Sequence, residues 1–403
     1  MRRKLLAALM LLALGMPGAT ARTRLMVVSD IHYLAEGLHG DDTLIRALRN
    51  GDGKLTQHMD ALLDGLRQEA VRLHPDALLV TGDLAFNGER DSHLALAKRF
   101  AAIEALGVPV WVLPGNHDIN VARPAGFKDG GWYPVEGVTP EAFSEIYADF
   151  MGPAGEGANL SYVANVGEEL RVAMTDVAFY DGGAQTFGIF LAGHGRWLEA
   201  ALRDAKEHGA AVITASHHSL VCHTEFLKDS YLMMGSPGMA VLDERYGVRL
   251  HLSGHLHMQH IATEDGLTDA ATGAFCTWPH RYALVTLRDD GTLEYEARTL
   301  SDDLLPEGFM DMSRAWYLDI AREKSRASLE GRELTKAARD AMADYAARFN
   351  LACFAGTFRA DDSAWREDPG YALWQRLPDA LFTQYLEQTL NGPPQDNLKK
   401  TIP

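Results

Sequence analysis

The sequence predicts an α/β domain with a parallel sheet, followed by a smaller domain made only of helices. In the first third of the chain, short apolar runs of strand length alternate with longer stretches of helical periodicity. Polar residues follow each of these runs at once. Strand-like patterns stop near the polar segment 301–307, and only helical patterns follow it. We therefore expect a large domain over residues 22–302 and a helical domain over residues 303–403.

The first five predicted elements have the order strand, helix, strand, helix, strand. Such a series usually forms a parallel sheet with right-handed crossovers. Its strands end at one common edge, where open α/β sheets bind their ligands. Pro75 and Gly107 end the two helical segments. The elements cover residues 24–29, 56–73, 77–80, 91–106 and 108–112.

The middle of the chain predicts a long insertion and further strands. Residues 121–167 are rich in glycine and proline, with one helical patch at 141–150, and we expect them to lie over the site. Hairpin-like alternation over 271–299 has Asp290-Gly291 as its turn. Further strands are expected at 170–176, 211–216 and 248–252, and a helix at 194–208.

Three segments with apolar residues at helical spacing predict the helical domain, at residues 313–329, 333–351 and 371–390. Pro378 should divide the last segment and open a second helix in its first turn. The apolar faces of these helices are expected to pack against the large domain.

The N-terminus has the three parts of a secretory signal peptide. Arg2-Arg3-Lys4 is positive, residues 5–14 are apolar, and Ala19-Thr20-Ala21 is a small-residue cleavage site. The apolar run is too short to span a bilayer, and no later segment is apolar enough to do so. We therefore expect residues 1–21 to be removed, no transmembrane segment to remain, and the protein to be exported to a periplasmic or extracellular place.

Charge and cysteine content exclude several classes of function. The formal net charge of −17 argues against a broad basic face for nucleic-acid polymers or anionic membranes. Cys222, Cys276 and Cys353 show no CxxC spacing, so they form no zinc ribbon or redox motif. A phosphate-bearing substrate would have to be attracted by local cations.

Asp, Asn and His side chains follow five of the predicted strands. Imidazole and carboxylate ligands together suit Zn, Fe and Mn, whereas carboxylates alone would suggest Mg or Ca. Seven candidate ligands are too many for one tetrahedral ion and suit two ions about 3.5–4 Å apart, as in phosphoester cleavage. The expected cofactor is therefore two divalent or trivalent ions (Fe, Mn or Zn). The strand ends carry Asp30 and His32, Asp83, Asn116 to Asp118, His217 and His218, and His255 and His257.

These strand ends carry a family resemblance. In order, Asp30-x-His32, Gly82-Asp83, Gly115-Asn116-His117-Asp118, Ser216-His217 and Gly254-His255-x-His257 resemble the five motifs of the calcineurin-like metallophosphoesterases. The resemblance extends over about residues 25–300. It is nearest to the class III cyclic-nucleotide phosphodiesterases, which include exported bacterial members with a helical C-terminal domain. It implies that residues 22–302 form a four-layer α/β/β/α sandwich.

The resemblance also implies roles for the seven candidate ligands. Asp83 would bridge both ions, since a carboxylate has two oxygens, and a hydroxide shared by the ions would attack phosphorus. His117 would bind the phosphoryl group and protonate the leaving oxygen, and Asp118 would orient the His117 ring. Asp30, His32 and His257 would hold one ion, and Asn116, His217 and His255 the other.

Other residues near the motifs are weaker candidates. His218, His223, Asn120 and His39 are possible substrate contacts. Phe86 stands where purple acid phosphatases have the iron-binding tyrosine, which excludes a tyrosinate–iron site. Ser219-Leu220 stand where phosphodiesterase members often have Pro-Pro.

A small phosphoester is the expected substrate, and hydrolysis of cyclic nucleotides or related small phosphodiesters is the preferred interpretation. The insertion offers only Arg123 and Lys128 as cations, which favours a singly charged diester over a doubly charged monoester. A phosphomonoesterase acting on a nucleotide or sugar phosphate, or a pyrophosphatase or lipid-headgroup hydrolase, remains an alternative at the same site. A non-catalytic metal-binding recognition protein is the third hypothesis.

Overall fold

The computed structural model describes residues 23–49, 51 and 53–403. The predicted signal peptide, residues 1–21, lies outside this described part. Within it, no helix combines the length and apolar character needed to cross a membrane.

The first of two six-stranded sheets is half parallel and half antiparallel. Its order is β14-β13-β12-β1-β2-β3. Its parallel half consists of the three strands predicted from the first third of the chain. Its antiparallel half consists of the predicted hairpin, which turns at Asp290-Gly291, and the last strand of the chain. The strands are β1 (Thr23–Val28), β2 (Ala77–Thr81), β3 (Val110–Leu113), β12 (Arg281–Leu287), β13 (Leu293–Thr299) and β14 (Lys399–Ile402).

The second sheet has the order β10-β11-β9-β8-β7-β6. Strands β7, β8, β9 and β11 run parallel, and the two edge strands run antiparallel to their neighbours. The strands are β6 (Tyr162–Val166), β7 (Leu170–Met174), β8 (Ala211–Ala215), β9 (Leu250–Ser253), β10 (His260–Glu264) and β11 (Leu267–Ala271).

The two sheets pack face to face, because alternate residues of each strand point to opposite sides. On β1, Leu25 and Val27 belong to the core between the sheets, where they meet Val172 and Leu252 of the second sheet. The intervening Met26 and Val28 belong to a second core, on the outer face of the first sheet. Both faces of the strand are therefore buried, which explains its continuous apolar run.

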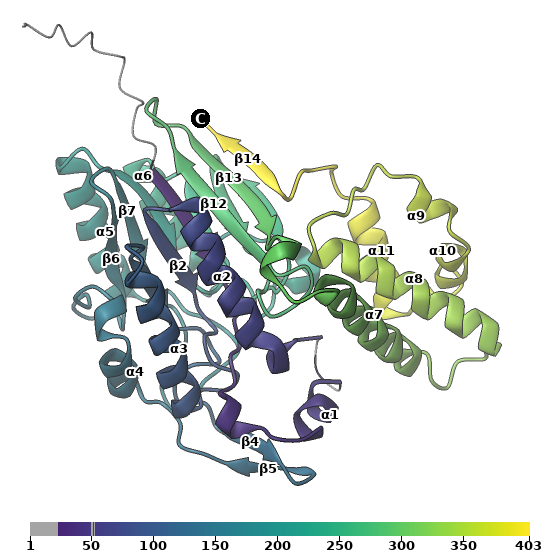
Figure 1. The fold of residues 1–403 in the computed structure, drawn as a ribbon. Helices are drawn as coiled ribbons and strands as arrows, with labels where there is room; N and C mark the ends of the chain where they lie inside the picture. Colours follow the sequence, from purple (N-terminus) through teal and green to yellow (C-terminus); the bar gives the residue numbers. More distant parts are fainter. Residues whose placement is uncertain (1–22, 50, 52) are drawn as a thin grey trace, which may run out of the picture.

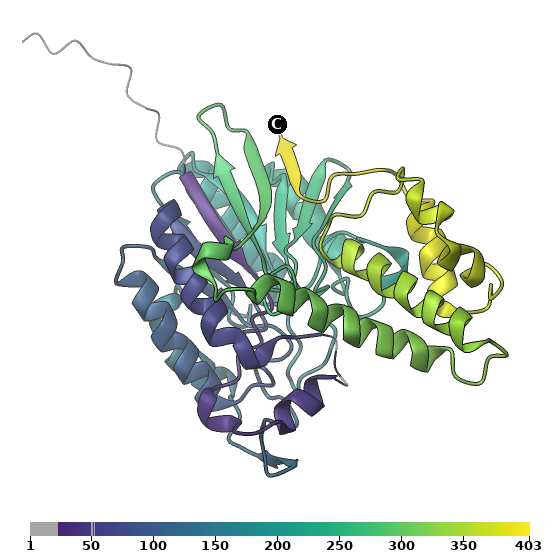
Figure 2. The ribbon, with the colours of Figure 1, turned by 45° about the vertical axis from the view of Figure 1, so that its right-hand side comes forward.

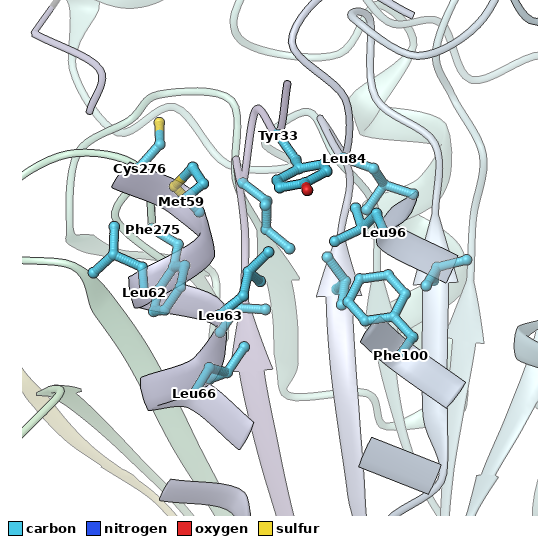
Figure 3. Close-up of a cluster of buried hydrophobic side chains, with 14 of the residues drawn as sticks. Tyr33, Met59, Leu62, Leu63, Leu66, Leu84, Leu96, Phe100, Phe275 and Cys276 are labelled. Carbon is cyan, nitrogen blue, oxygen red and sulfur yellow. The ribbon is translucent and has the colours of Figure 1, made fainter. Parts of the chain in front are cut away.

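Helices cover the outer face of each sheet, so the predicted four-layer α/β/β/α sandwich is confirmed. Helices α2 (Met59–Leu73) and α3 (Arg90–Glu104) pack on the first sheet. Figure 3 shows the apolar side chains that they contribute, among them Leu62, Leu66, Leu96 and Phe100. Helices α5 (Ala192–Glu207) and α6 (Ser236–Tyr246) cover the second sheet.

A helical domain follows the sandwich, as predicted, and stands to one side of it in Figures 1 and 2. It has its own apolar core around Tyr345, Phe349 and Trp374. Pro378 lies in the break between the last two helices, although the second begins only at Leu381. The helices are α7 (Phe309–Ser328), α8 (Lys336–Phe354), α9 (Ala364–Glu367), α10 (Pro369–Trp374) and α11 (Leu381–Leu390).

The end of the chain differs from the expectation that residues 303–403 form only helices. Strand β14 leaves the helical domain and pairs with β13, with Ile402 opposite Leu293. The helical domain is thus connected to the sandwich at both ends (Figure 1). Four residues are too short for a periodic pattern, so this strand was missed.

The insertion contains the predicted helix, as α4 (Pro140–Ile146), and a hairpin that was not predicted. The hairpin strands are β4 (Ala125–Lys128) and β5 (Gly131–Pro134). Its turn, Asp129-Gly130, has positive φ at both residues, 54° and 81°. Asp-Gly is the sequence that such two-residue turns favour.

Candidate metal centre

Side chains from both sheets meet beyond the carboxyl ends of their strands and form two groups of potential metal ligands. In each group the ligand atoms lie within 4.8 Å of one another. Asp83 belongs to both groups, as a bridging ligand must. The first group is Asp30, His32, Asp83 and His257, and the second is Asp83, His217 and His255.

The two oxygens of Asp83 face different groups. Its Oδ2 lies 3.4 Å from Nε2 of His32, and its Oδ1 lies 3.3 Å from Nε2 of His217. The Oδ1 atom also accepts a 2.8 Å hydrogen bond from the backbone N–H of His117. This carboxylate therefore stands between the groups with one oxygen available to each.

The first group has the features of a cation site. Nε2 of His257 lies 3.3 Å from Oδ1 of Asp30 and 3.1 Å from Nε2 of His32. Oδ1 of Asp30 is buried and has no hydrogen-bond partner among the residues that the structure describes. A buried carboxylate oxygen without a hydrogen bond is costly unless a cation pairs with it. The residues present therefore fit a bound metal ion.

The second group shows which nitrogens are available. Nδ1 of His217 donates a 2.8 Å hydrogen bond to the carbonyl of Thr81, so Nε2 is the nitrogen left for a metal. That Nε2 lies 3.2 Å from the side-chain oxygen of Asn116, the neutral ligand expected here. Nε2 of His255 donates to the carbonyl of Ser230 at 3.2 Å, which leaves its Nδ1 for a metal.

The backbone at the strand ends is bent so that these side chains converge. A positive φ is uncommon for residues other than glycine and costs of order 1–3 kcal/mol where it is held. Such residues gather at functional sites. Five of the seven candidate ligands have this conformation: Asp30 (53°), His32 (47°), Asp83 (52°), His255 (63°) and His257 (55°).

Two motif glycines are explained by close approach to the ligands. A Cβ added at Gly115 would lie 2.3 Å from Oδ1 of Asp83. One added at Gly254 would lie 1.8 Å from Oγ of Ser29 and 2.8 Å from Oδ2 of Asp30. No side chain fits at either position without moving a candidate ligand.

We expect Gly254→Ala to weaken metal affinity by about 10–100-fold, because the added methyl group displaces the side chain of Asp30. Gly131→Ala is the matched control, since nothing lies within 4 Å of its added Cβ. Metal content after dialysis, measured by atomic absorption, compares the two variants. Equal metal content would show that the close packing around Gly254 has no part in the site.

Electrostatics favour metal binding by these side chains. Burial lowers the pKa of His32 and of His255 well below the usual value, so both imidazoles are neutral. Burial also disfavours the charge on Asp83 and on His217, but their mutual attraction outweighs it. The pKa of Asp83 is therefore well below its usual value, and that of His217 rises to about 9. Metal ions would replace the proton on His217 in balancing this carboxylate.

His117 lies beside the two groups, with its ring centre 4.9 Å from that of His32. Its Nδ1 donates to the side-chain oxygen of Asn87 at 2.8 Å and lies 3.2 Å from the carbonyl of Phe86. These contacts fix the ring and leave Nε2 as the reactive nitrogen. Burial lowers the pKa of this imidazole, an effect that Asp83 opposes and the charge of Lys54 reinforces.

Asp118 does not orient His117, so that expectation is wrong. Its buried carboxylate accepts hydrogen bonds from the backbone N–H groups of Leu84, Ala85 and Gly115 at 2.9, 2.9 and 2.7 Å. It thereby ties the loop after β2 to the loop after β3. Burial raises the pKa of the Asp118 carboxyl to about 7, and the charge of Asp83 adds to the shift.

Two of the four predicted substrate contacts have buried side chains. The side chain of His218 is fully buried, and its Nε2 donates to the carbonyl of Thr186 at 3.0 Å. The ring of His223 is also buried, with Nδ1 3.0 Å from Nδ1 of His260 and Nε2 3.5 Å from Asp269. Neighbouring residues enclose the ring of His218, whereas His223 borders a cavity that is also lined by His260 and Gln395.

The other two predicted contacts, Asn120 and His39, are half-buried. The amide of Asn120 donates to the carbonyl of Tyr180 at 3.2 Å, which braces the loop that carries it. His39 pairs through its backbone with Phe127 in the hairpin of the insertion. Contact of either residue with a substrate stays a prediction.

Two residues that act on His117 were missed. Asn87 orients His117. It is polar and lies in the same loop as Asp83, so the sequence contained signals that could have identified it. Lys54 has its charge close enough to lower the pKa of both His32 and His117.

Comparison with known proteins agrees with this geometry. Residues 23–259 match the calcineurin-like phosphoesterase family. The chain belongs to that family. Residues 298–396 match a second family, described as the C-terminal domain of cyclic nucleotide phosphodiesterase. As members of this family hydrolyse phosphoesters with bound metal, the chain is a metal-dependent phosphoester hydrolase.

Two curated relatives and one solved structure are similar to this member of the calcineurin-like phosphoesterases. The 3′,5′-cyclic adenosine monophosphate phosphodiesterases CpdA of Escherichia coli K12 and of Escherichia coli O157:H7 are each 26% identical over 328 residues, covering 74% of this chain and 99% of theirs. A dimetal phosphatase from Danio rerio has a TM-score of 0.50 and 15% identity, covering 69% of this chain and 96% of its own. This last likeness shows a shared fold.

Proposed function

We propose that this phosphoester hydrolase acts on phosphodiesters, either cyclic nucleotides or related small diesters. The match of its helical domain to the C-terminal domain of cyclic nucleotide phosphodiesterase carries the proposal. The relatives named as cyclic adenosine monophosphate phosphodiesterases support it, since the alignment covers nearly their whole length.

The residues at the strand ends divide into two ligand sets. We assign Asp83 to both ions, because its two oxygens face different groups. When bound, a pair of such ions supplies a nucleophile at neutral pH and neutralises charge on the phosphoryl group. Asp30, His32 and His257 complete the first set, and Asn116, His217 and His255 complete the second.

His117 is assigned the proton transfer to the leaving oxygen. Its Nδ1 proton is held by Asn87, so only Nε2 can exchange a proton with a substrate. Donation from Nε2 requires the imidazolium form. The negative phosphoryl group of a bound substrate raises the pKa of a nearby imidazole and so favours that form.

The cations near the site favour a singly charged substrate. Of the two in the insertion, Lys128 is exposed and its Nζ donates to the carbonyl of Gly37, and Arg123 is also exposed. Lys54 supplies one buried positive charge beside His32 and His117. With both cations of the insertion exposed, a singly charged diester is favoured over a monoester, which carries nearly two negative charges at neutral pH.

The expected result is that protein loaded with Mn, Fe or Zn hydrolyses bis(p-nitrophenyl) phosphate with a higher kcat/KM than p-nitrophenyl phosphate. Release of p-nitrophenolate measures both reactions, and metal-free protein is the control. Activity on 3′,5′-cyclic adenosine monophosphate, followed by chromatography, tests the cyclic subclass. Cleavage of the monoester alone would contradict the proposal. Cleavage of no phosphoester by protein that holds two ions would favour the non-catalytic alternative.

A further inference from the structure

Strand β11 carries a carboxylate in its buried interior that belongs to neither ligand set. Asp269 is fully buried and stands in register with His251 of the neighbouring strand β9. Aspartate is uncommon within strands, and a buried carboxylate is costly unless hydrogen-bond donors satisfy its oxygens. The contacts of Asp269 must therefore offset that cost.

One oxygen of Asp269 holds the loop that carries His217. Its Oδ2 accepts hydrogen bonds from the backbone N–H groups of Leu220 and Val221, at 2.6 and 3.0 Å. These two residues come three and four positions after His217. Because a carboxylate accepts stronger hydrogen bonds than a neutral group does, the two bonds fix the backbone of the loop after β8.

The other oxygen holds the strand end that carries His255. Its Oδ1 accepts a 2.7 Å hydrogen bond from the hydroxyl of Ser253, the last residue of β9. The next residue, Gly254, donates its N–H to the carbonyl of His217 at 3.0 Å. Asp269 therefore contacts both loops close to the point where they meet. The rings that the loops present, His217 and His255, have their centres 5.0 Å apart.

The segment between α11 and β14 begins a chain of hydrogen bonds that leads to Asp269. The N–H of Ile261 donates to Oδ1 of Asn397 at 3.1 Å, which shows that this atom is the oxygen of the amide. Nε2 of Gln395 donates to the same oxygen at 2.9 Å and to Nε2 of His260 at 2.8 Å. The imidazole of His260 therefore accepts a hydrogen bond at Nε2.

This direction of donation fixes the protons of two imidazoles. Burial lowers the pKa of His260 to about 3, so its ring is neutral and its one proton is on Nδ1. Nδ1 of His260 donates to Nδ1 of His223 at 3.0 Å, so His223 carries a proton on Nε2, 3.5 Å from Oδ1 of Asp269. Burial would raise the pKa of Asp269, but His223 and Ser253 outweigh it and hold this pKa below its usual value. Asp269 is thus an ionised carboxylate with donors around both oxygens.

We propose that Asp269 is a positioning residue for the second metal ion, because it holds the backbone of both loops that carry the histidine ligands of that ion. The inference rests on the proposed function and adds to it a residue that touches neither metal nor substrate. The first ligand set depends on Asp269 less. Of its members, His257 lies in the loop after β9, whereas Asp30 and His32 follow β1 in the other sheet.

The first test compares Mn binding by wild type, Asp269→Ala and Asp269→Asn. In Asp269→Ala the ion of the second set should bind about 10–100-fold less tightly, the size found when residues that orient metal ligands are changed. The ion of the first set should keep nearly its wild-type affinity. Calorimetry measures both affinities, and the electron paramagnetic resonance signal of a coupled Mn pair should give way to that of a single Mn ion. Asp269→Asn keeps the shape and one oxygen, so it should lose less.

Glu69→Gln is the matched control. It also changes a buried carboxylate to an amide, but on the outer face of the first sheet, where Glu69 accepts a 2.6 Å hydrogen bond from Tyr282. It should keep both ions and the signal of the coupled pair. Equal weakening of both ions in the Asp269 variants would indicate a general loss of structure. That result, or unchanged affinity for the second ion, would overturn the inference.

The second test separates the two loops. Ser253→Ala removes the bond to the strand end of His255 and leaves Leu220 and Val221 with their acceptor. It should weaken the second ion by about 2–10-fold, the size of one hydrogen bond. If Ser253 acts through Asp269, the double variant Ser253→Ala/Asp269→Ala binds this ion no more weakly than Asp269→Ala alone. Losses that multiply in the double variant would contradict the positioning role.

Failure of this inference is distinguishable from failure of the proposed function. Wild-type protein that binds two ions but hydrolyses no diester would contradict the function, while the Mn titrations would still decide the role of Asp269. Conversely, an active diesterase whose second ion is insensitive to Asp269→Ala and to Ser253→Ala would keep the function and remove the inference.

Discussion

Substitution of Asp83 by alanine is expected to remove both metal ions and nearly all activity. Its two oxygens face the two ligand groups, and among the described residues no other side chain belongs to both groups. Activity should fall by at least about 10²–10³-fold, the size seen when one electrostatic stabiliser is removed from an active site. Metal content per chain, measured after gel filtration, should fall with it.

The variant Asp83→Asn tests the effect of the negative charge of this side chain separately from the effect of its shape. It keeps the size of the side chain and one oxygen, so we expect it to retain more metal than Asp83→Ala and still lose activity. Exposed Asp204, whose partner is Arg171, provides a control alanine substitution away from the centre. If Asp83→Ala kept two ions and wild-type activity, the assignment of a bridging carboxylate would be wrong.

Substitution of His117 by alanine should lower kcat by about 10²–10⁴-fold while metal content stays at the wild-type level. The loss should be smaller for a diester with a good leaving group, such as p-nitrophenolate, than for an alkyl ester, because a poor leaving group depends more on protonation. Turnover of the two ester types, measured side by side, reports this difference.

A second variant tests the same role through Asn87, whose side-chain oxygen accepts the hydrogen bond from Nδ1 of His117. Asn87→Leu removes the acceptor that fixes the His117 ring, and we expect a loss of about 10–100-fold, as for other residues that orient active-site groups. Loss of metal in His117→Ala, or an equal effect on both ester types, would contradict its role as the acid.

The layers of the fold could be predicted because burial leaves a strong mark on sequence. Strands β1 and β2 are buried on both faces, so they form continuous apolar runs that any periodicity analysis finds. The hairpin of the insertion shows the limit of such patterns. Its turn, Asp129-Gly130, was a usable signal, but each strand has only four residues, and most of residues 131–134 are exposed.

The candidate ligands could be predicted because all follow strands, and strand ends meet at one edge. The direction in which each side chain points could not be predicted, as the pair His117 and Asp118 shows. These neighbours in sequence point to different places, since the backbone turns between them. His117 contacts Asn87 from another loop, and Asp118 is buried among backbone N–H groups. Residue spacing alone carries no information about that turn.

Lys54 and Trp316 show why long-range contacts escape a reading of sequence alone. They are 262 residues apart and lie in different domains, yet one donates a hydrogen bond to the other. His218 gives the converse case. It follows a candidate ligand directly and packs against the ring of His255, but its side chain is fully buried and its Nε2 donates to the carbonyl of Thr186.

We expect two metal ions to bind at the strand ends, on either side of Asp83. Anomalous diffraction from crystals of the Mn-loaded protein tests it most directly. We predict two peaks per chain, one among Asp30, His32 and His257 and the other among Asn116, His217 and His255, with Asp83 contacting both. A single peak, or peaks away from Asp83, would contradict the claim.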